Sequence, residues 1–295
     1  MSETENHKSG FVNIIGKPNV GKSTLMNQLV GEKLSIITSK AQTTRHRIMG
    51  ILNGDDFQII YSDTPGILKP MYELHKSMMH FVKISVEDAD VLILIVEIFE
   101  NIDTEILDPI MRKVQGKVIL LLNKTDLVKD KKEIETKTEQ WKAYHDFDAI
   151  IPISALKNDN IDLVFKTILG FLPVHPPFYP KDQLTDKAER FFASEIIREK
   201  IFMTFKQEVP YSTEVVISDF KEDEKIIRMR AEIYVERSSQ KGIIIGKGGA
   251  ALKKIGIEAR KDLEAFFDKQ VYLEQYVKVE KDWRRQKNKL SRFGY

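Results

Sequence analysis

The chain has 295 residues, of which 42% are hydrophobic and 31% charged, and it contains no cysteine. At roughly 100 to 200 residues per domain, this length predicts about two globular domains. The lack of cysteine excludes a disulfide framework, cysteine zinc sites, iron–sulfur clusters and thiol catalysis, and it favours an intracellular protein. The start, MSETENHKSG, does not predict a signal peptide, and the longest apolar stretch, Val91 to Phe99, is too short to span a membrane.

Charge is unevenly distributed along the sequence. The 46 basic and 44 acidic residues leave a net charge of +2, but residues 186–295 carry 24 basic and 19 acidic side chains. Residues 278–295 alone hold seven basic and two acidic residues. This tail has two interpretations, a solvated terminal helix or a patch that binds a polyanion.

The first part of the chain alternates between apolar strands and helical patterns. Strands are predicted at 11–15, 46–52, 57–61, 91–96, 118–122 and 150–153, and helices at 69–87, 103–114, 130–144 and 160–171. Such alternation predicts an α/β fold, a mostly parallel sheet with helices on both faces.

The character of the sequence changes at residue 173, because four of the ten prolines fall within residues 173–180. We therefore predict a first domain at 1–172, a proline-rich linker at 173–185 and a second domain at 186–295. The expected order in the second domain is a helix (187–206), two strands (212–220 and 225–236), a helical turn, a glycine loop, a helix and a strand (271–279). That order describes a smaller α+β domain.

A phosphate-binding loop follows the first strand. The segment GKPNVGKS matches the pattern GxxxxGK[ST] between a predicted strand and a predicted helix. Its backbone N–H groups would bind phosphates, Lys22 would reach the β- and γ-phosphates, and Ser23 would bind Mg²⁺. The predicted nucleotide contacts here are Gly16, Lys17, Pro18, Asn19, Val20, Gly21, Lys22, Ser23 and Thr24.

A second motif, DTPG, follows the strand at 57–61. Asp63 would hold Mg²⁺ on the metal side, and the Gly66 N–H would contact the γ-phosphate, so that this loop rearranges on hydrolysis. The predicted contacts are Asp63, Thr64, Pro65 and Gly66.

Two further motifs predict guanine recognition. In NKTD, the Asp126 carboxylate would accept two hydrogen bonds from guanine that adenine cannot donate, Asn123 would orient the loop and Lys124 would cover the base. Ser154 and Ala155 follow the next strand, where the Ala155 N–H would meet guanine O6. These motifs select GTP over ATP.

Between the first two motifs, a threonine is needed to complete the Mg²⁺ shell from a mobile loop. Thr43 and Thr44 compete for this role, and we favour Thr44. The assigned catalytic group is Lys22, Thr44 and Gly66. Ile67 stands where small GTPases often carry a glutamine that orients water, so slow intrinsic hydrolysis is expected.

A second glycine loop lies in the C-terminal domain, within IIIGKGGAALKKIG. A GxxG loop between two helices can hold an RNA backbone, with splayed bases in a neighbouring apolar groove for which Ile243, Ile244 and Ile245 are candidates. The predicted RNA contacts are Ile244, Gly246, Lys247, Gly248, Gly249, Lys253, Arg284 and Arg285.

Together, GKPNVGKS, AQTTRHR, DTPG, NKTD, SA, the proline-rich linker, IIIGKGGAALKKIG and VKVEKDWR resemble the Era family of bacterial ribosome-assembly GTPases. The resemblance implies a Ras-like GTPase domain and a type II KH domain that binds the 3′ end of 16S rRNA in the small-subunit precursor. It also implies a cytoplasmic protein that contacts the inner membrane peripherally, and Mg²⁺ as the metal. Asn19 resembles the asparagine with which related GTPases use K⁺, whereas VEIFENID departs from relatives and receives no role.

We therefore interpret the chain as a GTP-driven switch whose nucleotide state governs RNA binding. Two alternatives stay open. One is a GTPase that powers modification or translocation and docks a protein on its second domain. The other is a membrane-associated signalling GTPase that uses the basic tail.

Overall fold

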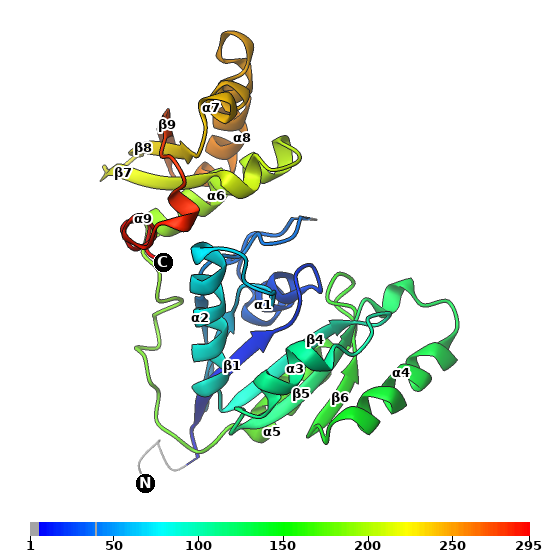
Figure 1. Cartoon of the computed structure of the whole chain (residues 1–295). Helices are drawn as coiled ribbons and strands as arrows, with labels where there is room; N and C mark the ends of the chain where they lie inside the picture. Colours follow the sequence, from blue (N-terminus) through cyan, green and yellow to red (C-terminus); the bar gives the residue numbers. More distant parts are fainter. Residues whose placement is uncertain (1–5, 39) are drawn as a thin grey trace. The chain divides into compact units, whose positions relative to one another are not determined.

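The computed structural model describes residues 6–38 and 40–295, which form two compact units (Figure 1). The first unit contains residues up to Ser35 together with 44–70 and 75–186. The second contains 36–43, 71–74 and 187–295. Two short segments from the first half of the sequence therefore belong to the second unit, which no local pattern in the sequence indicated.

A six-stranded sheet forms the centre of the first unit, in the order β2-β3-β1-β4-β5-β6. Only the pairing of β2 with β3 is antiparallel, so the sheet is mostly parallel, as predicted. The strands are β1 (Lys8–Ile15), β2 (Ile48–Asn53), β3 (Phe57–Asp63), β4 (Val91–Glu97), β5 (Lys117–Asn123) and β6 (Ala149–Pro152).

Helices cover both faces of this sheet (Figure 1). α2 (Glu73–Glu87), α3 (Thr104–Met111) and α4 (Lys131–Tyr144) share one buried apolar core with β4 and β5, to which Trp141 contributes the largest side chain. α1 (Lys22–Val30) packs on β1, β2 and β3 and on α5 (Ile161–Phe171). The predicted α/β architecture is confirmed.

The proline-rich segment 173–185 is hydrogen-bonded to the first unit. The side-chain amide of Gln58 donates to the Tyr179 carbonyl over 2.8 Å and accepts from the Phe178 N–H over 2.7 Å. Further along, the Ile51 N–H donates to the Leu184 carbonyl over 2.8 Å. The segment that the sequence suggested as a linker therefore lies along β2 and β3.

The second unit contains the predicted order α, β, β, α, α, β. Its elements are α6 (Glu189–Thr204), β7 (Glu214–Glu222), β8 (Ile226–Val235), α7 (Ser238–Ile245), α8 (Ala250–Phe267) and β9 (Gln270–Val279), followed by the short α9 (Lys287–Arg292). The sheet order is β7-β8-β9, with β8 and β9 parallel. Apolar side chains of α6 and α8 cover one face of the sheet and form its core.

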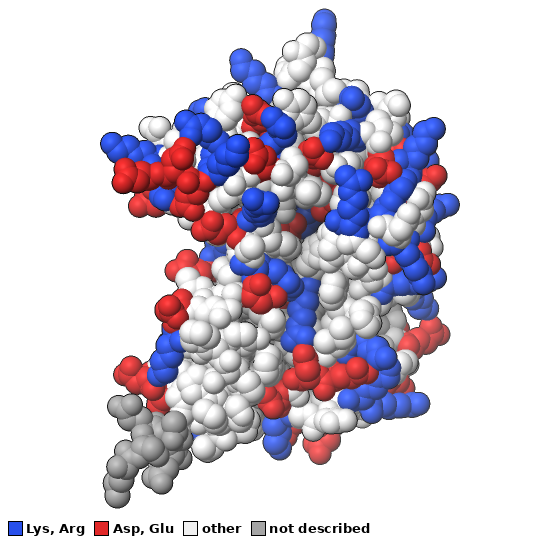
Figure 2. Space-filling view, turned by 90° about the vertical axis from the view of Figure 1, so that its left-hand side faces the viewer, with Lys and Arg blue, Asp and Glu red and all other residues white. Residues whose placement is uncertain are grey.

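The basic tail is folded onto this unit. Trp283 is fully buried and its indole N–H donates to the Ser212 carbonyl over 3.0 Å. Lys278 and Lys289 are ion-paired with Glu232 and Glu280. Figure 2 shows basic and acidic side chains interspersed on the face that it presents. Part of the charge that suggested a polyanion patch is thus neutralised locally.

Among the described residues, no helix combines the length and the apolar character that crossing a membrane requires.

The two tryptophans are buried in different units, at Trp141 and Trp283, and they allow each unit to be followed separately. We expect Trp283→Ala to destabilise the second unit by about 3–5 kcal/mol, because it leaves a cavity and removes the bond to Ser212. Urea unfolding followed by circular dichroism should show this loss, while fluorescence of the remaining Trp141 stays unchanged. Trp283→Phe should lower the free energy of unfolding of the second unit by less than Trp283→Ala. If Trp283→Ala left that free energy unchanged, the packing argument would be wrong.

Candidate functional site

The phosphate-binding loop joins the carboxyl end of β1 to the amino end of α1. Gly21, the residue before α1, has a φ of 104°, in the left-handed region that favours glycine. A Cβ atom there would lie 2.2 Å from the Asn123 side-chain nitrogen. The sequence therefore requires glycine at this position both for backbone conformation and for close packing.

Lys22 is buried inside the loop. Its Nζ donates to the Gly16 carbonyl over 3.1 Å and to the Lys17 carbonyl over 2.8 Å. Because an ammonium group has three donors, it retains one for a phosphate. Burial lowers the pKa of Lys22 to about 8, although the charges of Asp63 and Glu100 act in the opposite direction.

Three oxygen-bearing side chains meet next to Lys22. Ser23 Oγ donates to Asp63 Oδ2 over 2.7 Å, and Thr44 Oγ1 lies 3.0 Å from Ser23 Oγ and 3.3 Å from Asp63 Oδ2. Thr43 is directed elsewhere, with its hydroxyl 2.8 Å from that of Thr38. The structure thus brings Thr44 to this cluster.

Asp63 is an incompletely satisfied carboxylate. It is fully buried, and its Oδ1 has no hydrogen-bond partner among the described residues. Burial raises the pKa of Asp63, opposed by the charge of Lys22 and by the hydroxyls of Ser23, Ser35 and Thr44. A divalent cation would favour the ionised form, so the three side chains fit Mg²⁺, which prefers oxygen ligands and keeps water and phosphate in its shell. Among the residues that the structure covers, no group of three His, Cys, Asp or Glu side chains offers an all-protein alternative.

The DTPG loop packs against the phosphate-binding loop. The Ile67 N–H donates to the Gly16 carbonyl over 3.0 Å, and a Cβ on Gly66 would lie 2.7 Å from the Pro18 nitrogen. Thr64 differs from our expectation, since its buried hydroxyl donates to the Ile14 carbonyl over 2.7 Å and so joins β3 to β1. Ile67 is buried in the core, where it cannot orient water.

Asn123 joins three of the motifs. Its Nδ2 donates to the Val20 carbonyl over 2.6 Å, and its Oδ1 accepts from the Ala155 N–H over 2.9 Å. We expected that N–H to face guanine O6, so a contact with the base would have to share it in a bifurcated hydrogen bond. Asp126 accepts from Ser154 Oγ over 2.6 Å, which orients its carboxylate.

A cavity of about 400 Å³ lies beside these guanine-recognition residues. Its lining includes Thr125, Asp126, Ser154, Lys157 and Asn160. Space and hydrogen-bonding groups therefore occur together at the carboxyl ends of β5 and β6.

In the second unit, the loop 246–249 connects α7 to α8. Gly246 has a φ of 72° and a ψ of 174°, and a Cβ there would lie 2.7 Å from that of Ala251. Lys247 and Lys253 are exposed and make no ion pair among the described side chains. The loop thus presents backbone and positive charge at the amino end of an 18-residue helix.

Two predicted RNA contacts are placed differently from what the sequence suggested. Ile244 is fully buried in the core of the second unit, so its side chain cannot stack on a base, and the exposed neighbour is Ile243. Arg284 is ion-paired with Glu236 and only 20% exposed. Arg285 is exposed. The sequence could not tell which of Ile243 and Ile244 is buried, because that depends on which face of α7 packs against the core.

Comparison with known proteins shows the family. Residues 11–124 match the family described as 50S ribosome-binding GTPase, and residues 208–284 match the KH domain. The chain is 46% identical over 292 residues to GTPase Era of Staphylococcus epidermidis, covering 98% of this chain and 97% of that protein. It belongs to the Era family of GTPases.

Other relatives agree. GTPase Era of Syntrophus aciditrophicus is 47% identical over 293 residues, covering 98% of this chain and 95% of that protein. A crystal structure of Era with MgGDPNP and nucleotides 1506–1542 of 16S ribosomal RNA is 42% identical and has a TM-score of 0.94. Aquifex aeolicus Era bound to GDP·AlF4⁻ is 41% identical and has a TM-score of 0.93. In both comparisons, the matched region includes 98% of this chain and 99% of the chain in the crystal structure.

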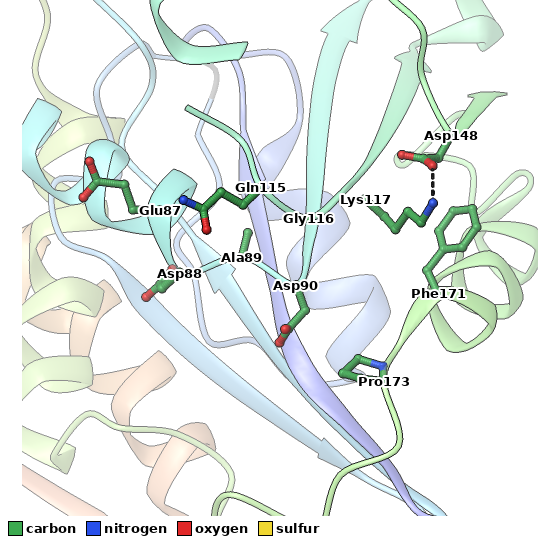
Figure 3. Close-up of a pocket in the computed structure, with 10 residues that line it drawn as sticks. All are labelled: Glu87, Asp88, Ala89, Asp90, Gln115, Gly116, Lys117, Asp148, Phe171 and Pro173. Atoms are coloured by element: carbon green, nitrogen blue, oxygen red, sulfur yellow. Dashed lines mark hydrogen bonds and ion pairs between the residues drawn. The ribbon is translucent and has the colours of Figure 1, made fainter. Parts of the chain in front are cut away.

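A further pocket of this Era-family chain lies away from the nucleotide motifs. It has a volume of about 540 Å³ and lies at the amino ends of β4 and β5 (Figure 3). Its Lys117 Nζ is 2.8 Å from Asp148 Oδ1, and its lining is Glu87, Asp88, Ala89, Asp90, Gln115, Gly116, Lys117, Asp148, Phe171 and Pro173. Four carboxylates make this pocket unfavourable for a nucleotide anion.

Three acidic residues at the site belong to none of the predicted motifs. Glu97 is the last residue of β4, and Glu100 and Asp103 follow it. All three are ion-paired with lysines of the nucleotide motifs. They lie within VEIFENID, the segment that departs from relatives and received no role, and their position after a buried strand was a second signal, since the carboxyl ends of parallel strands share one edge of the sheet.

The lowered pKa of Lys22 predicts two opposite pH effects. GTP affinity should fall as pH rises above about 8, by at most about tenfold per pH unit, because the phosphates require the protonated amine. The stability of the nucleotide-free protein should instead rise between pH 8 and the ordinary value of 10.5, because the unfolded chain binds more protons there.

Calorimetric GTP titrations and urea unfolding across this range measure the two effects. Lys22→Met should remove the part of the rise in stability above pH 8 that comes from Lys22. A pH-independent GTP affinity up to pH 10 would contradict the assignment of Lys22.

Proposed function

We propose that this Era-family GTPase is a GTP-driven switch that binds single-stranded RNA at the 3′ end of 16S rRNA and acts in assembly of the small ribosomal subunit. The main support is its likeness, over 98% of the chain, to an Era structure described as containing both MgGDPNP and a 16S rRNA segment. The two glycine loops, one in each unit, give the chain a means to bind each ligand.

On the nucleotide side, Lys22 would bind the β- and γ-phosphates, and Ser23, Thr44 and Asp63 would hold Mg²⁺, which neutralises charge on the phosphates. Asp126 would accept hydrogen bonds from guanine. The clustering of Ser23, Thr44 and Asp63 within 3.3 Å, with one carboxylate oxygen left without a partner, supports this assignment.

On the RNA side, the loop 246–249 would hold the backbone through its N–H groups and Lys247, and Lys253 and Arg285 would add positive charge. The exposure of these three side chains supports this assignment. Ile243, 48% exposed, replaces Ile244 as the apolar contact for a splayed base.

The RNA assignment is tested by the double variant Lys247→Asp/Gly248→Asp. A Cβ at Gly248 meets no atom within 4 Å, and Asp adopts its φ of 58° at a lower strain than most residues, so thermal melts should confirm that the double variant is folded. We expect binding of a short single-stranded RNA to fall at least about 100-fold, because two carboxylates replace the phosphate site. GTP affinity should stay unchanged.

Lys225→Asp is the control for the Lys247→Asp part of the variant, since it makes the same two-unit charge change at an exposed turn between β7 and β8. Filter binding in the presence of a GTP analogue, of GDP and of no nucleotide also measures the proposed coupling. RNA affinity equal in wild type and double variant would remove the RNA assignment, and affinity equal in all three nucleotide states would remove the coupling.

The alternative in which the second domain docks a protein requires no RNA affinity, so the same assay decides between them. We propose a cytoplasmic location and peripheral contact with the inner membrane on the family resemblance alone.

We further propose that K⁺ assists hydrolysis. Asn19 is exposed in the phosphate-binding loop with a φ of 65°, and the buried Ile67 cannot orient water. GTP hydrolysis should therefore be at least several-fold faster in K⁺ than in Na⁺, and Asn19→Ala should abolish the difference. Phosphate release measured at equal ionic strength tests this, and equal rates in the two salts would refute it.

A further inference from the structure

A loop of the first unit places three carboxylates against two lysines of the nucleotide motifs. Lys124 Nζ lies 2.6 Å from Glu97 Oε2, and Lys17 Nζ lies 3.0 Å from Glu100 Oε1 and 3.5 Å from Asp103 Oδ2. We call Glu97, Glu100 and Asp103 the acidic triad. It contacts one lysine of the phosphate-binding loop and one of the guanine-recognition motif.

The backbone fixes the acidic triad in place. Glu97 ends β4 beside Asn123 in β5, and the next N–H, that of Ile98, donates to the Asn123 carbonyl over 2.9 Å. At the other end, the Asp103 side chain accepts from the Ile106 N–H and caps α3. The carboxylates are therefore held by a strand end and a helix start rather than by a free loop.

The two lysines have different tasks at the proposed nucleotide site. Lys124 adjoins the base, so an ion pair that holds its Nζ restrains the stem that covers guanine. Lys17 adjoins the phosphates, where its positive charge would attract the nucleotide, but two carboxylates neutralise it. Glu100 also raises the pKa of the buried Lys22 and so favours its protonated form, for which reason the affinities are compared at pH 7, below that pKa.

We propose that the acidic triad sets guanine-nucleotide affinity from two sides. Glu97 strengthens binding by positioning Lys124 over the base. Glu100 and Asp103 weaken binding of the triphosphate by neutralising Lys17 and adding negative charge near the γ-phosphate. This inference rests on the proposed nucleotide site and assigns positioning residues to it.

The base side is tested by Glu97→Gln, which keeps the size of the side chain but removes its charge. The ion pair is partly exposed, with side chains 30% and 37% accessible, so its loss should be modest. We expect Mg·GDP and a Mg-bound non-hydrolysable GTP analogue to bind about two- to fivefold more weakly, by the same factor, because the base is common to both.

The phosphate side is tested by Glu100→Gln/Asp103→Asn, in which Asn can still cap α3. We expect the GTP analogue to bind about five- to tenfold more tightly and GDP to gain less, because the analogue carries more negative charge. The gain should shrink at higher salt.

Glu105→Gln is the matched control. It removes one negative charge, as Glu97→Gln and Glu100→Gln do, but in α3, where Glu105 is ion-paired over 2.9 Å with the exposed Lys69, and it should leave both affinities unchanged. Asp126→Asn controls for the proposed site itself and should weaken GTP binding by at least tenfold.

Isothermal titration of the full chain, with thermal melts to confirm folding, distinguishes the outcomes. If Asp126→Asn weakens GTP binding but Glu97→Gln and the double variant behave like Glu105→Gln, the inference fails and the site stands. If Asp126→Asn leaves GTP binding unchanged, the proposed site fails. Should the double variant not fold, Glu100→Gln alone must still shift the ratio of GTP-analogue to GDP affinity, or the phosphate side is overturned.

Discussion

The side-chain amide of Asn123 donates to the carbonyl of Val20 in the phosphate-binding loop and accepts the N–H of Ala155 in the last guanine motif. Three segments separated by up to 135 residues are thereby held at one buried point. An amide carries a donor and an acceptor on separate atoms, so the one side chain makes both hydrogen bonds. The nucleotide site depends on this pair of hydrogen bonds, because they fix the separation of its phosphate half from its base half.

At the same edge of the sheet, two buried ionisable groups lower the stability of the nucleotide-free protein. Lys22 and Asp63 are both buried, and burial opposes the charged form of each. A magnesium-bound triphosphate supplies the opposite charges, so its binding offsets this cost and stabilises the folded unit. A site built in this way is well suited to a switch, because its local structure depends on which nucleotide is present.

The glycine loop of the second unit is surrounded by less buried charge than the nucleotide site of the first. Its glycine loop brings backbone close to a ligand at the start of a long helix, while the lysines around it remain exposed. The basic tail, in contrast, is fastened by Trp283 and by local ion pairs. Positive charge in the sequence is therefore only partly available to a polyanion, and its position relative to carboxylates decides which part.

The sequence by itself determined the two architectures and most of the nucleotide motifs, because strand and helix periods and short glycine motifs are local properties. Lys22, Asp63 and Asp126 could be assigned in this way, since each follows a buried strand whose carboxyl end must lie at one edge of the sheet. The sequence favoured Thr44 over the adjacent Thr43 for the Mg²⁺ role, and only tertiary structure shows that the Thr44 hydroxyl reaches Ser23 whereas that of Thr43 reaches Thr38. Tertiary structure also decided that Ile244 is core, that Arg284 is ion-paired and that the acidic triad meets two lysines, because side-chain direction and pairing depend on neighbours distant in the chain.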